Sequence, residues 1–259
     1  MKPLSLHISP CPNDTFAFDA IINRRIESEF TDLEVEYLDI EQLNEGVLRG
    51  EPAISKISYA VYPQIADRYA LLDSGSALGR GNGQLLVRRT DESTPIRRVA
   101  SPGLNTTANA LLVRYFPDVE EIVPMLFSEI AAAVERGDVD AGVLIHEGRF
   151  VYERLRLTLV ANLGQLWEQE TGLPLPLGAI VARRDLPAEV REHFEQLLAE
   201  SVRYAMEYPS VSRGFVKQHA QELEDDVIDK HIALFVNDFT ISLGDEGRRA
   251  VERLVGACK

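Results

Sequence analysis

Short apolar runs alternate along the chain with longer segments in which apolar residues recur at every third or fourth position. The runs predict β-strands, and the clearest of them cover residues 4–8, 33–38, 53–57, 84–89, 97–100, 141–145 and 179–183. The periodic segments predict helices at residues 16–23, 40–48, 108–115, 128–135, 186–208, 211–223, 226–235 and 245–257. Because strands and helices alternate, the pattern indicates an α/β fold with largely parallel sheets.

Two local patterns occur twice in the chain. Ser-Pro-x-x-Asn-x-Thr runs from Ser9 to Thr15 and recurs 92 residues later, from Ser101 to Thr107. Val-x-Arg-Gly followed by an acidic residue occurs at 47–51 and again at 134–138. Each Ser-Pro loop is expected to lead from a strand into a helix, and each Arg-Gly pair to end one. Chance recurrence of common turn residues is the alternative interpretation.

The repeated patterns predict two similar lobes joined by two chain crossings. We expect the first lobe to comprise residues 1–90 and 185–259 and the second to comprise residues 91–184, with crossings near Thr90 and near Gly178. This is the two-lobed type II periplasmic-binding-protein-like architecture, in which the ligand cleft lies between the lobes. Hinged closure of such lobes is a recurrent motion.

His146 is the candidate for acid–base chemistry. The apolar run 141–145 stops at this residue, and open α/β sheets place their ligand sites outside the carboxyl ends of strands. Histidine titrates near neutrality, so it can accept and return a proton. The alternative is a histidine that only caps the strand or bonds a backbone carbonyl.

The Ser-Pro loops also predict an anion site, because two helix N-termini would point into one cleft. Asn13 or Asp14 is the expected N-cap of the first helix. Side chains expected to contribute hydroxyl groups or positive charge are those of Lys56, Ser58, Thr106 and Thr107.

Net charge and the distribution of apolar residues indicate which kinds of partner the protein can bind. A formal net charge of −14 argues against nucleic acid or an anionic membrane as a partner, although a local basic pocket is still compatible with it. No run approaches the roughly 20 apolar residues of a membrane span, and the N-terminus does not resemble a signal peptide, so we expect a cytoplasmic protein. Composition does not predict the oligomeric state.

Several residues are expected to play no chemical part. Cys11 and Cys258 form no metal-binding motif, and a structural role is favoured for Cys11. The glycines at 79–83 have the wrong spacing for a dinucleotide loop. The remaining helical histidines, His193, His219 and His231, are expected to be solvated.

Six blocks in order along nearly the whole chain resemble the 1,4-dihydroxy-6-naphthoate synthases of the futalosine route to menaquinone. They are SPCPNDTFAF near the start, SKISYAVY at 55–62, SGSALGRGNGQLL at 74–86, GLNTTA at 103–108, IHEGRF at 145–150 and TGLPLPLGAIVARRDL at 171–186. A single block would be weak evidence for this family, but the six blocks together, in this order, are specific to it.

The resemblance implies a carbon–carbon lyase without metal or organic cofactor. It implies cyclic dehypoxanthinyl futalosine, a small-molecule carboxylate, as the substrate and 1,4-dihydroxy-6-naphthoate as the product. The base of that family matches His146. Its substrate-binding segments match Lys56, Ile57 and Ser58 in one place and Thr106, Thr107 and Ala108 in another.

Two other functions are compatible with the same fold. Chorismate dehydratase of the same pathway is one, and a non-catalytic small-anion-binding protein is the other. The blocks around His146 and in the first Ser-Pro loop favour the naphthoate synthase. Incubation with each substrate would distinguish the three.

Overall fold

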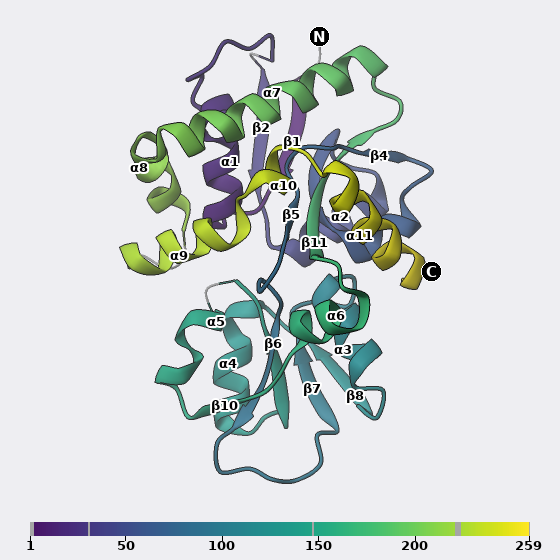
Figure 1. Cartoon of the computed structure of the whole chain (residues 1–259), viewed down its shortest axis with the longest axis vertical. Coiled ribbons are helices and arrows are strands. Elements are labelled where there is room, and N and C mark those ends of the chain that lie inside the picture. The colour runs from purple at the N-terminus through teal and green to yellow at the C-terminus, as the bar shows by residue number, and fades with distance from the viewer. Residues whose placement is uncertain (1–2, 31, 147, 221–223, 259) are drawn as a thin grey trace.

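The computed structural model describes residues 3–30, 32–146, 148–220 and 224–258 and contains two separate β-sheets (Figure 1). The first sheet has the strand order β2-β1-β3-β11-β4, and β5 also pairs with β11. Its strands are β1 (Leu4–Ile8), β2 (Leu33–Tyr37), β3 (Ile54–Ser58), β4 (Tyr69–Leu71), β5 (Ala77–Gly79) and β11 (Leu175–Arg183). β1 runs parallel to β2 and to β3, whereas β11 runs antiparallel to β3, β4 and β5.

The second sheet has the order β10-β6-β9-β7-β8. Its strands are β6 (Leu85–Arg89), β7 (Arg98–Ser101), β8 (Glu121–Pro124), β9 (Ala141–Leu144) and β10 (Leu157–Asn162). β7 is parallel to both β8 and β9, and β6 is antiparallel to β9 and β10. The alternating α/β pattern of the sequence therefore yields mixed sheets, and each is antiparallel where the chain enters or leaves its lobe.

Helices cover both sheets. They are α1 (Pro12–Ile22), α2 (Ile40–Arg49), α3 (Thr107–Tyr115), α4 (Phe127–Arg136), α5 (Gly148–Val151), α6 (Leu163–Thr171), α7 (Ala188–Glu207), α8 (Pro209–His219), α9 (Asp225–Phe235), α10 (Asp238–Ile241) and α11 (Gly244–Ala257), with 3₁₀ turns η1 (Tyr59–Gln64) and η2 (Tyr152–Arg154). In Figure 1 the C-terminal helices α7 to α11 all lie on the first sheet's side of the molecule.

Three hydrophobic clusters hold this arrangement together. One lies between the first sheet and α1 and α7, and another between the second sheet and α4. The largest joins the two sheets, since it contains Ile57 of β3 as well as Val143 of β9 and the fully buried Trp167. The Trp167 indole donates a hydrogen bond to the Pro174 carbonyl at 3.1 Å, which gives this aromatic residue a packing role.

The expected lobe boundaries require a correction. We predicted that residues 84–89 end the first lobe, but β6 pairs with β9 and β10 of the second sheet. The first crossing thus lies between β5 and β6, before Leu85, and β11 returns the chain to the first sheet from Leu175 onward. An apolar run predicts a strand, but its sheet depends on hydrogen-bond partners that are distant in sequence.

Local signals had mixed outcomes. The two Arg-Gly pairs end α2 and α4 as predicted, because Gly50 and Gly137 take left-handed φ values of 76° and 79°. The first helix begins earlier than predicted, at Pro12 with Cys11 as N-cap, so neither Asn13 nor Asp14 caps it. Proline at the first helical position fixes φ in advance and moves the start forward. The predicted helix 211–223 corresponds to α8, which begins at Pro209 and ends at His219, and residues 221–223 lie outside the part of the chain that the structure describes.

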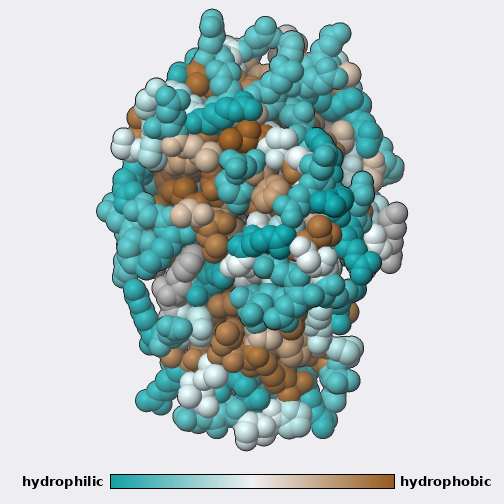
Figure 2. Space-filling model, viewed as in Figure 1, coloured by the Kyte–Doolittle hydropathy of each residue, from teal (hydrophilic) through white to brown (hydrophobic). Residues whose placement is uncertain are grey.

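The visible surface is predominantly hydrophilic, with separate hydrophobic patches in the upper and lower parts of the view (Figure 2). Among the described residues, the longest helices lack the continuous apolar stretch that crossing a bilayer would require.

Candidate active site

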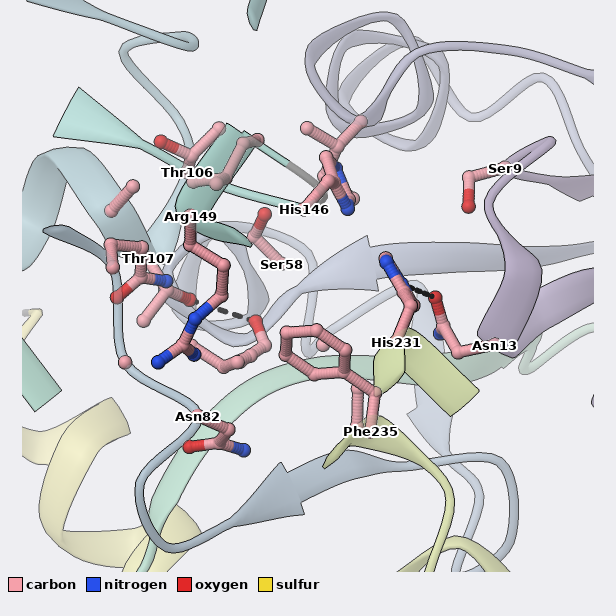
Figure 3. Close-up of a pocket in the computed structure, with 18 of the residues that line it drawn as sticks. Ser9, Asn13, Ser58, Asn82, Thr106, Thr107, His146, Arg149, His231 and Phe235 are labelled. Atoms are coloured by element: carbon pink, nitrogen blue, oxygen red, sulfur yellow. Dashed lines mark hydrogen bonds between the residues drawn. The ribbon is translucent and has the colours of Figure 1, made fainter. Parts of the chain in front are cut away.

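A cavity with about 690 Å³ of empty volume lies between the two sheets. The first lobe contributes the β1–α1 loop, the first turn of α1, β3, β11 and α9, and the second contributes the loop before β6, the start of α3 and the end of β9. The lining residues are Ser9, Asn13, Asp14, Ile40, Lys56, Ser58, Ala77, Asn82, Gly83, Gln84, Thr106, Thr107, Ala108, Leu144, Ile145, His146, Arg149, Leu177, Gly178, His231 and Phe235. Segments that are far apart in the sequence therefore meet here (Figure 3).

His146 occupies this cavity at the carboxyl end of β9, as predicted. Its backbone has φ of 50°, a left-handed value that is uncommon for a residue with a side chain. Its ring lies edge-to-face with Phe127, and its Nδ1 lies 3.4 Å from Cys11 Sγ. Burial lowers the pKa of His146 to about 4; Asp14 opposes this shift, and Lys56 adds to it. At neutral pH the imidazole is uncharged and can accept a proton.

A buried ion pair also lines the cavity. Lys56 Nζ lies 2.7 Å from Asp14 Oδ1, and both side chains are almost fully buried. Asp14 also accepts hydrogen bonds from the Ser9 hydroxyl at 2.7 Å and from Asn13 Nδ2 at 2.8 Å. The positive charge of Lys56 is thus already compensated by Asp14. The first Ser-Pro loop presents a neutral polar network to the cavity and differs in this respect from the anion site that we predicted there.

The second Ser-Pro loop has the predicted form. Thr106 is the N-cap of α3, and its hydroxyl accepts a hydrogen bond from Asn109 N at 3.2 Å. The hydroxyl of Thr107 donates to the Leu177 carbonyl at 2.9 Å, which ties the second lobe to β11. Thr107 and Ala108 carry first-turn N–H groups, which have no partner within their own helix. This helix end is a suitable place for an anionic group of a ligand.

Two of the three residues predicted on β3 reach the cavity. Ser58 lies in its wall and is fixed by Asn44, whose Oδ1 accepts from Ser58 N at 2.8 Å. Lys56 also lines the cavity, but the Ile57 side chain points to the opposite face and packs in the largest hydrophobic cluster. Alternation along a strand sends neighbouring side chains to opposite faces, so the prediction for Ile57 is not supported.

The prediction that His231 is solvated is wrong. Its side chain is buried, 1% exposed, and its Nε2 lies 3.0 Å from Asn13 Oδ1. The ring lies nearly parallel to His146, with centroids 6.0 Å apart. By contrast, His193 is exposed as predicted, and His219 is partly buried between Tyr37 and Phe215. Apolar neighbours at helical spacing, Val227, Ile228 and Phe235, were the available signal that this face of α9 is buried.

Arg149 is a second residue that we did not assign to the site. It follows His146 by three positions and donates a hydrogen bond to the Gly81 carbonyl at 2.8 Å, across the first crossing. Burial lowers the pKa of its guanidinium. Among the residues that the structure describes, His, Cys, Asp and Glu side chains form no group of three or more suited to a metal ion.

Comparison with known proteins shows the family to which the chain is similar. A family model described as menaquinone biosynthesis matches residues 4–259. A curated relative, the 1,4-dihydroxy-6-naphthoate synthase of Thermus thermophilus, is 46% identical over 257 residues, which is 98% of this chain and 93% of that protein.

Solved structures support the fold. A crystal structure of a protein from Archaeoglobus fulgidus has a TM-score of 0.93 and 32% identity and covers 98% of this chain and 96% of its own. A Candida albicans protein described as having the generic periplasmic-binding-protein fold has a TM-score of 0.72 at 10% identity, with 100% and 90% of the two chains covered. The second similarity shows the fold alone.

Proposed function

The chain belongs to the menaquinone-biosynthesis family, and from this premise we propose that it is a carbon–carbon lyase that converts cyclic dehypoxanthinyl futalosine to 1,4-dihydroxy-6-naphthoate. The observation that carries the proposal is His146: a neutral, partly buried imidazole at a strand end, inside the cavity between the two sheets. A site of this kind suits a proton abstraction in an enclosed space.

In the proposed reaction His146 removes a proton from the spiro-ring portion of the substrate. Ring opening and retro-aldol-type cleavage follow, which break a carbon–carbon bond and release a small carbon fragment beside the naphthoate, and aromatization of the naphthoate supplies driving force. The enzyme then has to provide a placed base and exclusion of water. The ring of Phe127 and the thiol of Cys11 both contact the imidazole, which supports its role as a base that is held in place.

The substrate carboxylate is proposed to bind at the N-terminus of α3, at Thr106, Thr107 and Ala108. The supporting observation is that these residues line the cavity beside the Ser58 hydroxyl. We propose that Asn13, Asp14 and Lys56 bind substrate hydroxyls. The charges of Asp14 and Lys56 already cancel each other, and Asn13 is uncharged, so this wall suits neutral polar groups.

The two lobes are proposed to comprise residues 1–84 with 175–259 and residues 85–174, as the strand pairing suggests. The substrate is a free small molecule rather than a macromolecule, and the enzyme is proposed to work in the cytoplasm. The net charge of −14 supports the absence of nucleic acid and anionic membrane as partners.

The decisive experiment supplies the purified protein with cyclic dehypoxanthinyl futalosine in buffer containing EDTA and follows 1,4-dihydroxy-6-naphthoate by its absorbance after chromatography. We expect turnover in wild type and a loss of at least about 100-fold in His146→Ala, the usual contribution of a general base. EDTA should leave the rate unchanged. Near-wild-type turnover in His146→Ala would end the assignment of the base.

Two further assays test the alternative functions, chorismate dehydratase and a non-catalytic binding protein. Dehydration of chorismate would indicate the sister enzyme, and tight binding of the cyclic substrate without product would indicate a binding protein. His193→Ala, a substitution at an exposed histidine outside the cavity, is the matched control and should retain wild-type turnover.

A further inference from the structure

The side chain of Phe235 is buried without belonging to the hydrophobic core. Only 7% of the residue is exposed, yet it is part of none of the three hydrophobic clusters that the described residues form. It is the last residue of α9 and lines the cavity between the two sheets. A phenyl ring gains most when both its faces and its edge are packed, so a ring at a cavity wall has apolar surface available to a ligand.

Helix α9 places this ring beside the histidine one turn earlier. Residues four apart share one face of a helix, so His231 and Phe235 point the same way, and their ring centroids are 4.7 Å apart. The His231 ring is in turn 6.0 Å from that of His146, measured between centroids. In the view of Figure 3 the Phe235 ring reaches into the space that the lining side chains surround. The phenyl ring therefore lies in the same part of the cavity as the proposed base.

The cavity wall around these rings is largely aliphatic. Leu144 and Ile145 come from the end of β9 and the residue after it, and Leu177 comes from β11. Among the described lining residues, Phe235 supplies the only phenyl ring. Two aromatic rings in offset or edge-to-face contact attract each other more than their buried area alone explains, whereas an aliphatic side chain lacks this interaction. Phe235 is thus the residue through which the wall can distinguish an aromatic ring from a saturated one.

We propose that Phe235 is a specificity-determining residue, whose ring packs against the carboxylate-bearing ring of the naphthoate skeleton. The inference rests on the proposed function. The carboxylate then lies at the N-terminus of α3, and the reacting part of the skeleton lies near His146. The site selects a flat aromatic acid over a saturated acid with the same carbon skeleton.

A pair of acids with one carbon skeleton tests the proposal. The probes are 2-naphthoate and its saturated counterpart, decahydro-2-naphthoate, and calorimetry on the purified whole chain measures the affinity of each. We expect wild type to bind 2-naphthoate about three- to tenfold more tightly than the saturated acid. Phe235→Leu should lose most of this preference, because leucine retains an apolar side chain but has no aromatic ring.

The ratio of the two affinities separates this role from a merely structural one. If Phe235 only supports α9, Phe235→Leu weakens both acids by the same factor and leaves their ratio as in wild type, which would overturn the inference. Equal binding of the two acids by wild type would overturn it as well. Phe239→Leu is the matched control, since that ring is partly buried against the largest hydrophobic cluster and does not line the cavity. It should keep the wild-type ratio.

A second measurement on the wild-type protein does not require Phe235→Leu to fold. With ¹³C-labelled phenylalanine, we expect nuclear Overhauser effects between the ring protons of Phe235 and the protons of bound 2-naphthoate. The conservative variant Phe235→Tyr identifies the resonances by their absence. No such effect at saturating 2-naphthoate would contradict the contact.

The outcomes distinguish the two proposals. If wild type forms product from the cyclic substrate but shows no preference that depends on Phe235, the inference fails and the proposed function stands. If wild type neither forms the product nor binds 2-naphthoate, the proposed function fails and takes the inference with it.

Discussion

At the scale of single residues, the site depends on a buried ion pair and on the hydrogen bonds that satisfy it. Asp14 and Lys56 form an ion pair with side-chain exposures of 4% and 6%, and hydrogen bonds from Ser9 and Asn13 satisfy the carboxylate. A buried pair of this kind offsets its own desolvation only while both members are present. The pair thus fixes the shape of the cavity wall and leaves it electrically neutral.

Removing both members of this pair should therefore cost less than the sum of the two single removals. We expect Asp14→Asn and Lys56→Met each to lower the free energy of unfolding by about 3 kcal/mol or more, because each leaves one buried group uncompensated. The double variant should be less destabilised than the sum of the two. Urea unfolding of all four proteins completes the double-mutant cycle, and simple additivity would contradict the coupling.

The two cavity-lining histidines, His146 and His231, predict how stability depends on pH. The pKa of His146 is lowered to about 4 and that of His231 is also lowered, against about 6.5 in the unfolded chain. Below pH 6.5 the unfolded chain binds more protons than the folded protein, so their contribution is present above pH 6.5 and is lost as pH falls toward 4. We expect His146 alone to remove about 2 kcal/mol of stability between pH 7.5 and pH 5.

Urea unfolding at the two pH values measures this effect. The His146→Asn variant should show a shallower decline than wild type, whereas His193→Asn, at an exposed position, should decline in parallel with wild type. Equal slopes in all three proteins would show that the imidazole of His146 titrates normally in the folded state.

At the scale of elements, close backbone approach positions the first crossing. A Cβ atom added to Gly83 would lie 2.2 Å from the Cα of Gly164, at the start of α6, and one added to Gly164 would lie 2.4 Å from the Cα of Gly83. The segment entering β6 therefore packs directly on the backbone of α6. Gly83 also lines the cavity, so this contact helps to set the width of the site.

Alanine at position 83 should disrupt this contact. We expect Gly83→Ala to lower stability by roughly 1–3 kcal/mol and to reduce turnover, because backbone atoms cannot rotate away as a side chain can. The control is Gly214→Ala in α8, where an added Cβ meets nothing within 4 Å. That substitution should leave turnover unchanged and raise stability by up to about 1 kcal/mol. Thermal unfolding and the product assay report both effects.

At the scale of the whole molecule, hydrogen bonds beside the cavity join the two lobes. Glu41 of α2 accepts hydrogen bonds from the backbone N–H of Asn105 at 3.1 Å and from its side-chain Nδ2 at 2.8 Å. Asn44, one turn further along the same helix, donates to the Asn105 carbonyl at 3.3 Å. These bonds join a helix of the first lobe to the second Ser-Pro loop, immediately before the proposed anion-binding helix end.

Loss of this contact should loosen the closed arrangement of the lobes. We expect Glu41→Ala to raise KM about tenfold and to increase the radius of gyration measured by small-angle X-ray scattering, with a smaller effect on kcat. Glu45→Ala, an exposed position on the same helix that pairs only with Arg49 among the described side chains, is the control. Unchanged KM and radius in Glu41→Ala would show that the contact does not govern closure.

The sequence alone determined those features that depend on neighbouring residues. The spacing of apolar residues predicted the alternation of strands and helices, and the Arg-Gly pairs predicted the ends of α2 and α4. The end of the apolar run 141–145 placed His146 at the tip of a strand. The repeated Ser-Pro pattern likewise located two loops that both reach the cavity. These signals succeed because backbone geometry and side-chain alternation act over a few residues.

Only the tertiary structure decided which groups meet across long sequence separations. It assigned β6 to the second sheet, neutralised Lys56 with Asp14, sent Ile57 into the core and brought His231 of α9 against Asn13. Sheet membership, charge compensation and burial are set by the partners that packing supplies, and those partners lie 42 residues away for Lys56 and 218 for His231. Local patterns carry no information about such pairings, so the chemistry of the site emerges only when the two lobes come together.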